Sequence, residues 1–272
     1  MGLGTLWNRL TGPKGSIRSL GSARSWGSAA GSTRLFGRRG VAEEYLCGEG
    51  IEIGALHNPL KVPAAARVTY VDRMSYDDLI RAYPTMANKG IVRPAIIDNG
   101  ETLATLANES QDFVIANHMI EHAEDPVSVI ENFLRVVKPG GVIYLTIPDM
   151  RGTFDRHRPE TTVEHLLRDY REGPAWSRRD HFVEYARLVD QVTEPAALEA
   201  HVEHLIRTEF NIHYHCWSQR GMWAWLSALQ MELKFPFDVE FYLHRKSTKG
   251  EGEGIFILKK HLQNAYQQSI AN

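Results

Sequence analysis

The chain has 272 residues, of which 43% are hydrophobic and 24% are charged, with a formal net charge of −2 at pH 7. This length allows one α/β domain with an insertion or two small domains, and the charge balance argues against a general nucleic-acid binder. Two cysteines cannot build a disulfide framework, and no apolar run approaches the roughly 20 residues that span a bilayer, so we expect a soluble cytoplasmic protein.

Residues 1–44 are predicted to form a flexible, basic tail. Between Met1 and Ala42 the chain has no acidic residue, and glycine and serine fill most of the space between its basic side chains. Such a composition cannot bury enough apolar surface to order itself. The aromatic and aliphatic residues of this segment could give weak contact with an anionic membrane surface, and the same pattern also fits an organellar transit peptide.

Three short apolar runs are predicted to be the first strands of a sheet. They are Glu49–Gly54, Arg67–Asp72 and Pro94–Asp98. The first ends in a glycine and the other two end in an acidic residue. Since parallel sheets bind ligands beyond the carboxyl ends of their strands, these terminal residues are candidates for a binding site.

The segment 112–149 has the order strand, loop, helix, glycine turn and strand. Phe113–Ala116 and Val142–Ile147 are apolar runs that suit buried strands. The helix between them is predicted to begin at Asp125-Pro126, with a capping oxygen followed by proline at the first helical position. Pro139-Gly140-Gly141 is expected to end it as a turn. Two strands joined by a helix make a crossover unit, so the sheet is predicted to be parallel.

Beyond residue 150 the pattern changes to helices and then returns to strands. The strands alternate apolar and polar residues and are expected to pair as a hairpin. The expected elements are the helices Glu164–Tyr170, Arg179–Val189, Leu198–Arg207 and Trp217–Met231, followed by the strands Phe237–Leu243 and Ile255–Leu258.

Several short motifs stand in a recognisable order. Glu121-His122 follows a strand, Asp125-Pro126 starts a helix, and Lys138–Gly141 forms the turn after it. This arrangement resembles the class I, Rossmann-like S-adenosylmethionine-dependent methyltransferases, particularly the bacterial type 11 group. The segments Thr153–Pro159 and Ser177–His181 further resemble a bacterial subgroup of methyltransferase-domain proteins.

The resemblance implies an α/β fold. We expect a mostly parallel, seven-stranded sheet with a C-terminal antiparallel hairpin and a helical insertion. The expected parts are the tail 1–44, a cofactor-binding core 45–150, a helical cap 151–210, the completion of the core sheet 211–262 and a C-terminal tail 263–272.

The resemblance also implies S-adenosyl-L-methionine as the cofactor. Glycine lets the backbone approach a ligand where a side chain would collide, and the first strand ends in one such glycine. The loop lacks the further glycines that seat a pyrophosphate, which argues against NAD and against a nicotinamide oxidoreductase. The cofactor-binding candidates are Glu52, Gly54, Ala55, Asp72, Asp98 and Asn117.

Two of these acids have alternative interpretations. Asp72 follows Gly54 at close to the ~20-residue offset at which a carboxylate meets a ribose, but it could instead be a helix cap or a surface acid. Asp98 could contact the adenine edge, or it could serve as a turn residue in Asp98-Asn99-Gly100.

Methyl transfer to a hydroxyl is helped by a base near neutral pKa, for which histidine is the usual choice. The catalytic candidates are His118, His122, His213 and His215. In the family the Glu-His pair that includes His122 is often structural, and at least one of His213 and His215 could be a buried structural group. Asp149, Arg156 and Arg158 are candidates for binding the acceptor, although a solvated charged loop also explains the arginines. No metal ligand is assigned, because two histidines alone do not define a zinc site.

We therefore expect a methyltransferase that uses S-adenosyl-L-methionine to methylate a hydroxyl of a small or sugar-like acceptor. Its partner is expected to be a small molecule or glycan and not a nucleic acid, with at most weak peripheral membrane contact through the basic tail. The alternative is a methyltransferase-like binding or scaffold protein without turnover, which the reduced glycine content of the loop after Ile53 motivates.

Overall fold

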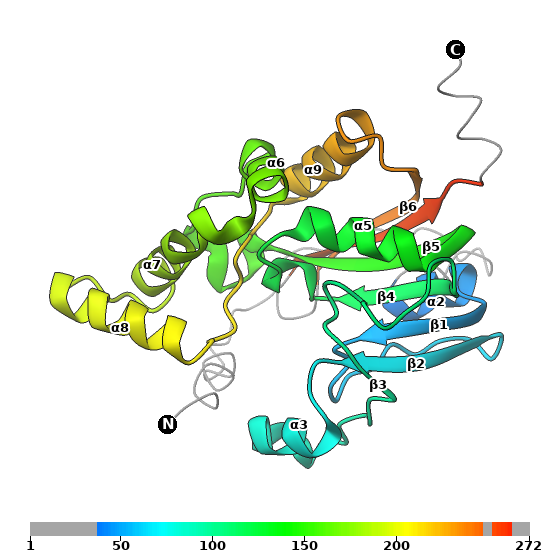
Figure 1. Cartoon of the computed structure of the whole chain (residues 1–272), viewed down its shortest axis with the longest axis horizontal. Coiled ribbons are helices and arrows are strands. Elements are labelled where there is room, and N and C mark those ends of the chain that lie inside the picture. The colour runs from blue at the N-terminus through cyan, green and yellow to red at the C-terminus, as the bar shows by residue number, and fades with distance from the viewer. Residues whose placement is uncertain (1–36, 247–251, 263–272) are drawn as a thin grey trace, which may run out of the picture.

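The computed structural model describes residues 37–246 and 252–262. The predicted tail therefore lies outside the described residues up to residue 36, as does the C-terminal tail 263–272. The helices and strands, shown in Figure 1, are α2 (Arg38–Tyr45), β1 (Gly48–Ile53), β2 (Ala66–Asp72), α3 (Tyr76–Ala82), α4 (Pro84–Ala87), β3 (Ile96–Ile97), β4 (Gln111–Asn117), α5 (Pro126–Val136), β5 (Val137–Asp149), α6 (Val163–Glu172), α7 (Arg178–Leu188), α8 (Pro195–Arg207), α9 (Gln219–Met231), β6 (Phe237–Lys246) and β7 (Gly252–Lys260).

Seven strands form one sheet within the described ranges, in the order β3-β2-β1-β4-β5-β7-β6. The first five strands of this order run parallel, and β7 is antiparallel to both of its neighbours. This confirms the predicted α/β fold, with its mostly parallel sheet and its C-terminal hairpin. The chain order changes direction between β1 and β4, and such a switch point is where open α/β sheets bind ligands.

The connection between α5 and β5 differs from the prediction. Asp125 caps α5 as expected, since its Oδ1 accepts a hydrogen bond from the Ser128 N–H at 3.0 Å. The predicted turn at residues 139–141, however, lies inside β5, because the chain passes straight from the helix into the strand. Between the pairs Gln111↔Val137 and Phe113↔Val142, β5 advances five residues while β4 advances two, so this part of β5 leaves the ladder. The glycines lie in that irregular segment, where Gly140 has a φ of +79°.

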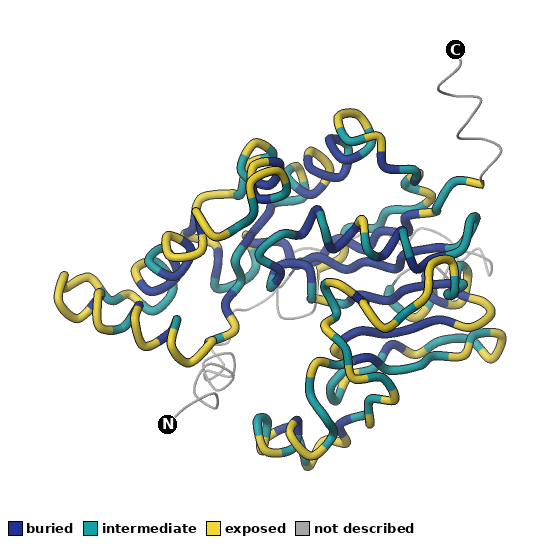
Figure 2. The backbone as a smooth tube through the Cα atoms, in the orientation of Figure 1, coloured by how far each residue is buried: buried dark blue, intermediate teal, exposed yellow. Residues whose placement is uncertain are grey.

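Helices cover both faces of the sheet, as Figures 1 and 2 show. Successive residues of a strand point to opposite faces, so β4 supplies Val114 to one core and Phe113 to the other. The larger core packs α5 and α9 against the sheet. The smaller core packs α2 through Val41 and Ala42. Residues 38–44 were predicted to belong to a flexible tail; that part of the prediction is wrong, because these two side chains are fully buried.

Between β5 and α9 the chain forms the cap, defined here as residues 150–216. The helices α7 and α8 pack together around their own apolar cluster, which includes Phe182 and Val202, and they project away from the sheet in Figure 1. Asp149 and Trp217 form a parallel β-bridge, and the Met150 N–H donates to the Trp217 carbonyl at 2.9 Å. The cap therefore leaves the core and returns to it at one place. No helix among the described residues is long and apolar enough to cross a membrane.

Candidate active site

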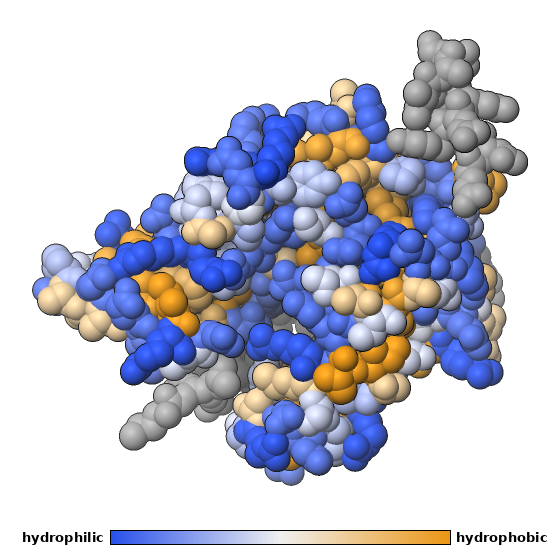
Figure 3. Space-filling model, viewed as in Figure 1, coloured by the Kyte–Doolittle hydropathy of each residue, from blue (hydrophilic) through white to orange (hydrophobic). Residues whose placement is uncertain are grey.

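A cavity of about 310 Å³ lies beyond the carboxyl ends of the parallel strands. Gly54 follows β1, Asp72 ends β2 and Asn117 ends β4, and all three line the cavity. Tyr83 contributes from beside α3, and Asn211 from the cap. The surface in Figure 3 is hollowed between the cap helices and the α3 region. The switch point of the sheet and the cap together therefore form the walls of this site.

Gly54 brings the backbone to the edge of the cavity. Its φ of +61° lies in the left-handed region, which glycine adopts without strain. A Cβ placed on it would meet no atom within 4 Å, so the space beside it is open. A single glycine here gives a ligand close access to the backbone, as the cofactor prediction requires.

Asp72 lines the same cavity. Its Oδ1 accepts a hydrogen bond from the Met74 N–H at 3.1 Å, and burial raises the pKa of its carboxyl. Asp72 does not cap α3, because Ser75 is the N-cap residue and accepts a hydrogen bond from the Asp78 N–H. A partly buried carboxylate at a strand end suits the two hydroxyls of a ribose. Gly54 and Asp72 thus fit an adenosyl group.

Other predicted cofactor residues lie elsewhere. The Glu52 side chain is buried and accepts hydrogen bonds from the Leu60 N–H and the Asn117 amide, so it holds the loop after β1 in place. Asp98 accepts from both the backbone and the hydroxyl of Thr105, which gives it the turn role. Neither side chain lines the cavity, and nor does Ala55.

A row of alternating carboxylates and imidazoles lies beside the cavity. His118 Nε2 is 3.0 Å from Glu253 Oε2, and His118 Nδ1 is 3.9 Å from Glu121 Oε1. On the far side, His213 Nε2 is 4.0 Å from the same Glu121 oxygen, and His213 Nδ1 is 2.7 Å from Asp155 Oδ2. The sequence supplied the histidines, but Glu253 and Asp155 were not identified as site residues.

His118 is the member of this row that faces the cavity. Its side chain is 42% exposed, and its φ of +51° is a conformation that costs energy for a residue other than glycine. Arg38 and Arg245 hold Glu253 in place. Burial alone would raise the pKa of Glu253, but hydrogen bonds from His118 and Arg38 lower it to about 2, so this carboxylate stays ionised. An ionised carboxylate fixes the orientation of the His118 ring.

His122 and His215 are poor proton acceptors for physical reasons. His122 lines the cavity with its Nδ1 hydrogen-bonded to the Ile212 carbonyl at 2.9 Å, but burial and the neighbouring His213 lower its pKa to about 3. His215 is fully buried and lies outside the cavity lining, and burial lowers its pKa well below the ordinary value. Both imidazoles are therefore neutral at physiological pH.

Glu121 occupies the centre of the row without a hydrogen-bond partner for either carboxylate oxygen among the described residues. It is 1% exposed, and burial raises its pKa to about 7. A raised pKa means that the folded protein holds this proton more tightly than the unfolded chain. The stabilisation is complete below about pH 4.5 and is lost as the pH rises through about 7.

We expect Glu121→Gln to remove this dependence on pH. The variant gains stability over the wild type as the pH rises from about 4.5 to about 7, by about 3 kcal/mol in total. Urea unfolding of both proteins at pH 5 and pH 8 measures the change. The exposed Glu131→Gln is the matched control. A difference between Glu121→Gln and wild type that is the same at both pH values would contradict the burial argument.

The predicted acceptor-binding residues are held by protein groups. Asp149 is paired with Arg151 and with His244 at 2.8 Å, and Arg156 is exposed beside His157. The Arg158 side chain is buried, and it is not available to a ligand, as the contacts below show. None of these predicted acceptor-binding residues lines the cavity.

Arg158 donates its hydrogen bonds to groups within the cap. It pairs with Asp155 at 2.7 Å and with Glu184 at 2.7 Å, and it donates to the carbonyls of His213 and Tyr214. This arginine therefore ties the start of the cap to α7 and to the segment that carries His213.

Two groups of described side chains could hold a metal ion. Within each group the ligand atoms lie within 4.8 Å of one another. The first group, the cap cluster, consists of His165, Asp169, His181 and His215; the second consists of Glu121, His122 and His213.

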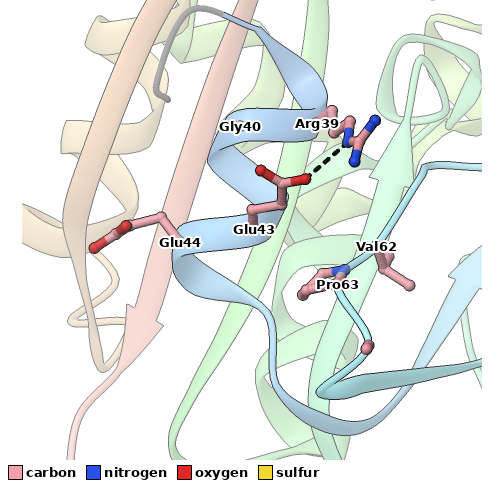
Figure 4. A pocket seen from close by; sticks show the side chains of 7 residues that line it. Arg39, Gly40, Glu43, Glu44, Val62 and Pro63 are labelled. Atoms are coloured by element: carbon pink, nitrogen blue, oxygen red, sulfur yellow. Dashed lines mark hydrogen bonds and ion pairs between the residues drawn. The ribbon is translucent and has the colours of Figure 1, made fainter. Parts of the chain in front are cut away.

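A second cavity, of about 470 Å³, lies between α2 and the loop before β2. Figure 4 shows its charged lining, where Arg39 pairs with Glu43 at 2.7 Å. Glu44 leaves this lining with one unbalanced negative charge, and no imidazole lines this cavity. The smaller cavity, which His118 and His122 line, is therefore the candidate active site.

Part of the chain matches a known family model. A family model described as a methyltransferase domain matches residues 44–145. The ubiquinone biosynthesis O-methyltransferases of Yersinia pestis (strain Pestoides F) and Yersinia pseudotuberculosis (serotype O:1b) are each 27% identical over 137 residues, which cover 50% of this chain and 55% of the relative. The chain thus spans about half the length of the curated relatives it matches.

Two solved structures illustrate the matches among known structures, both at low sequence identity. A SAM-dependent methyltransferase from Thermotoga maritima is 17% identical with a TM-score of 0.42, over 78% of this chain and 82% of that one. Another from Aquifex aeolicus is 12% identical with a TM-score of 0.39, over 82% and 85%.

Proposed function

We propose that this chain, whose residues 44–145 match a family model described as a methyltransferase domain, is a class I, Rossmann-like enzyme that transfers a methyl group from S-adenosyl-L-methionine to a hydroxyl of a small or sugar-like acceptor. The observation that carries the proposal is the cavity at the switch point of the sheet. Gly54, Asp72 and His118 line it together, although they follow three different strands.

The cofactor supplies an electrophilic methyl group on a sulfonium sulfur. In the proposed arrangement Asp72 accepts hydrogen bonds from the ribose hydroxyls, and the backbone at Gly54 lies against the adenosyl part. Asn117, whose amide donates to Glu52 at 3.1 Å, is held at the end of β4 beside the methionine part. The cap side of the cavity, at Asn211, is then left for the acceptor.

His118 is the proposed base. Because the ionised Glu253 can only accept a hydrogen bond, we assign the proton of the neutral ring to Nε2, which leaves the Nδ1 lone pair to take the proton of the acceptor hydroxyl. The acceptor oxygen forms a bond to the methyl carbon while the bond between that carbon and sulfur breaks, which yields S-adenosylhomocysteine. Glu253 is a positioning residue, because it stabilises the imidazolium that forms without touching the acceptor.

A hydroxyl acceptor is supported by two observations. The cavity is lined by polar groups, among them His118, His122 and Asn211, which suit an acceptor that carries hydrogen-bonding groups. The curated relatives that match half of this chain are named as O-methyltransferases. These observations support transfer to oxygen; the sugar-like character of the acceptor is our proposal.

Asp72→Ala tests the proposal at its first step. Loss of a carboxylate that accepts from two ribose hydroxyls is expected to weaken binding of S-adenosylhomocysteine about 10- to 100-fold, since hydrogen bonds to charged groups contribute about 1.5–3 kcal/mol. Isothermal titration calorimetry of wild type and variant gives the two dissociation constants.

The matched control is Asp98→Ala, which removes a carboxylate that accepts hydrogen bonds from Thr105. This variant is expected to bind S-adenosylhomocysteine with an affinity within about threefold of the wild type. Equal binding by wild type and Asp72→Ala would place the ribose elsewhere. No binding heat from the wild type at millimolar cofactor would instead favour the alternative of a scaffold without turnover.

A further inference from the structure

The cap cluster brings together four side chains from three separate segments. His165 and Asp169 lie four residues apart on one face of α6, and His181 lies on α7. His215 lies in the extended segment that leads back to the core. Asp169 and His215 are fully buried, and His181 is nearly so. The cavity proposed for methyl transfer does not include any of these residues.

The spacing of the donor atoms matches a small tetrahedral ion. A zinc ion with bonds of 2.0–2.1 Å to nitrogen or oxygen holds its ligand atoms about 3.3 Å apart. Here His165 Nε2 lies 3.1 Å from His181 Nε2 and 3.1 Å from Asp169 Oδ2. His215 Nε2 lies 3.8 Å from the same Asp169 oxygen.

The imidazole rings repeat this geometry independently. Their centroids are 5.0 Å apart for His165 and His181, 5.0 Å for His181 and His215, and 5.6 Å for His165 and His215. Three imidazoles bound to one tetrahedral zinc ion have centroids separated by about 5.2 Å. The three rings therefore surround a common point.

Hydrogen bonds within the protein satisfy only part of this cluster. His165 Nε2 lies at hydrogen-bond distance from His181 Nε2, and His215 Nε2 lies 3.2 Å from the Glu124 carbonyl, so zinc binding would replace these two contacts. Asp169 Oδ1 accepts from the Ser177 hydroxyl at 2.9 Å, but its Oδ2 has no hydrogen-bond partner among the described residues although it is fully buried. His215 Nδ1 is also buried without a partner in those residues. A buried carboxylate oxygen without a hydrogen-bond donor is costly, and it points to a ligand that supplies positive charge.

A neighbouring side chain holds the carboxylate of the cluster in place. The Ser177 hydroxyl fixes the orientation of Asp169, and such support from outside the ligand set is a regular feature of metal sites.

We propose that the cap cluster binds one zinc ion. Three neutral imidazoles and one carboxylate at tetrahedral spacing suit zinc, and a set of four protein ligands leaves no open position, which is typical of a structural site. His165 is partly exposed and gives the ion a route from solvent. The zinc ion fastens α6, α7 and the segment 211–217 to one another. It thereby holds the chain two residues from His213 without taking part in methyl transfer.

Metal analysis of the full, tag-free chain tests the proposal. Purified protein equilibrated with zinc and then dialysed is expected to retain one zinc per chain by inductively coupled plasma mass spectrometry. Removal of zinc by a chelator is expected to lower Tm by about 5–10 °C, and equimolar zinc is expected to restore it. Cobalt substituted for zinc is expected to give the strong visible absorption of a tetrahedral site.

The variants assign the ion to its ligands. Asp169→Asn and His181→Ala are each expected to lose the retained zinc, with circular dichroism used to verify the fold. The matched control is His201→Ala, which breaks a partly buried contact between His201 of α8 and Asp190 (2.8 Å) outside the cluster and is expected to keep one zinc per chain. His213→Ala tests the second group, because loss of zinc there together with retention in Asp169→Asn would move the ion to Glu121, His122 and His213 and overturn the proposal. No retained zinc in the wild type would also overturn it.

Discussion

Arg158→Met is expected to lower the free energy of unfolding by about 3–5 kcal/mol, since removal of one member of a buried ion pair leaves the other charge without a partner. The side chains of Arg158 and Asp155 are each 1% exposed and lie 2.7 Å apart. Methionine keeps much of the volume, so the loss measures the charge and its hydrogen bonds to the His213 and Tyr214 carbonyls.

Urea unfolding of the wild type and the variant measures this change, with Arg156→Met as the matched control. Arg156 lies two positions away in the same motif but is exposed, and its replacement is expected to change stability by less than about 0.5 kcal/mol. A small effect from both substitutions would show that Arg158 is free of its partners in solution, and it would restore this arginine as a candidate for binding the acceptor.

His118→Ala is expected to reduce the rate of methyl transfer by about 10²- to 10⁴-fold, because a positioned general base contributes an effect of that size. The affinity for S-adenosylhomocysteine is expected to change little, since the His118 ring is proposed to contact the acceptor hydroxyl and not the cofactor. Release of S-adenosylhomocysteine in the presence of a hydroxyl acceptor gives the rate, and calorimetry gives the affinity.

His157→Ala is the control for His118→Ala, because His157 is exposed on the cap and does not line the cavity. Glu253→Gln is expected to give an intermediate loss, since the ring of His118 remains but its orientation is less well fixed. Full activity of His118→Ala with a large loss in His213→Ala would assign the proton transfer to the other end of the carboxylate–imidazole row.

The sheet was predictable from the sequence because its signals are local. Buried parallel strands appear in the sequence as short apolar runs, and Asp125-Pro126 predicts the N-terminus of α5. The helix α2 was missed because its basic and small residues resemble the tail before it. Val41 and Ala42 become buried only when β4 and β5 supply a surface for them.

The site was less predictable because its contacts join distant parts of the chain. His118 could be identified from its place after β4, but its partner Glu253 is 135 positions away between two glycines. Asp155 and His213 are separated by 58 positions. No local pattern shows which carboxylate an imidazole will face. For the same reason, the sequence could not distinguish the buried Arg158 from the exposed Arg156.

The β-bridge between Asp149 and Trp217 brings the two ends of the cap together at one place on the sheet. A replacement insert whose two ends fit that bridge leaves every strand in its register, provided that its first helix keeps the contacts of α6 with α5 and α9. Chimaeras joined there can therefore exchange the wall that faces the acceptor while the edge formed by Gly54 and Asp72 stays intact. New variants of such a chain can therefore arise by replacement of the cap, while the part of the chain that carries Gly54 and Asp72 stays the same.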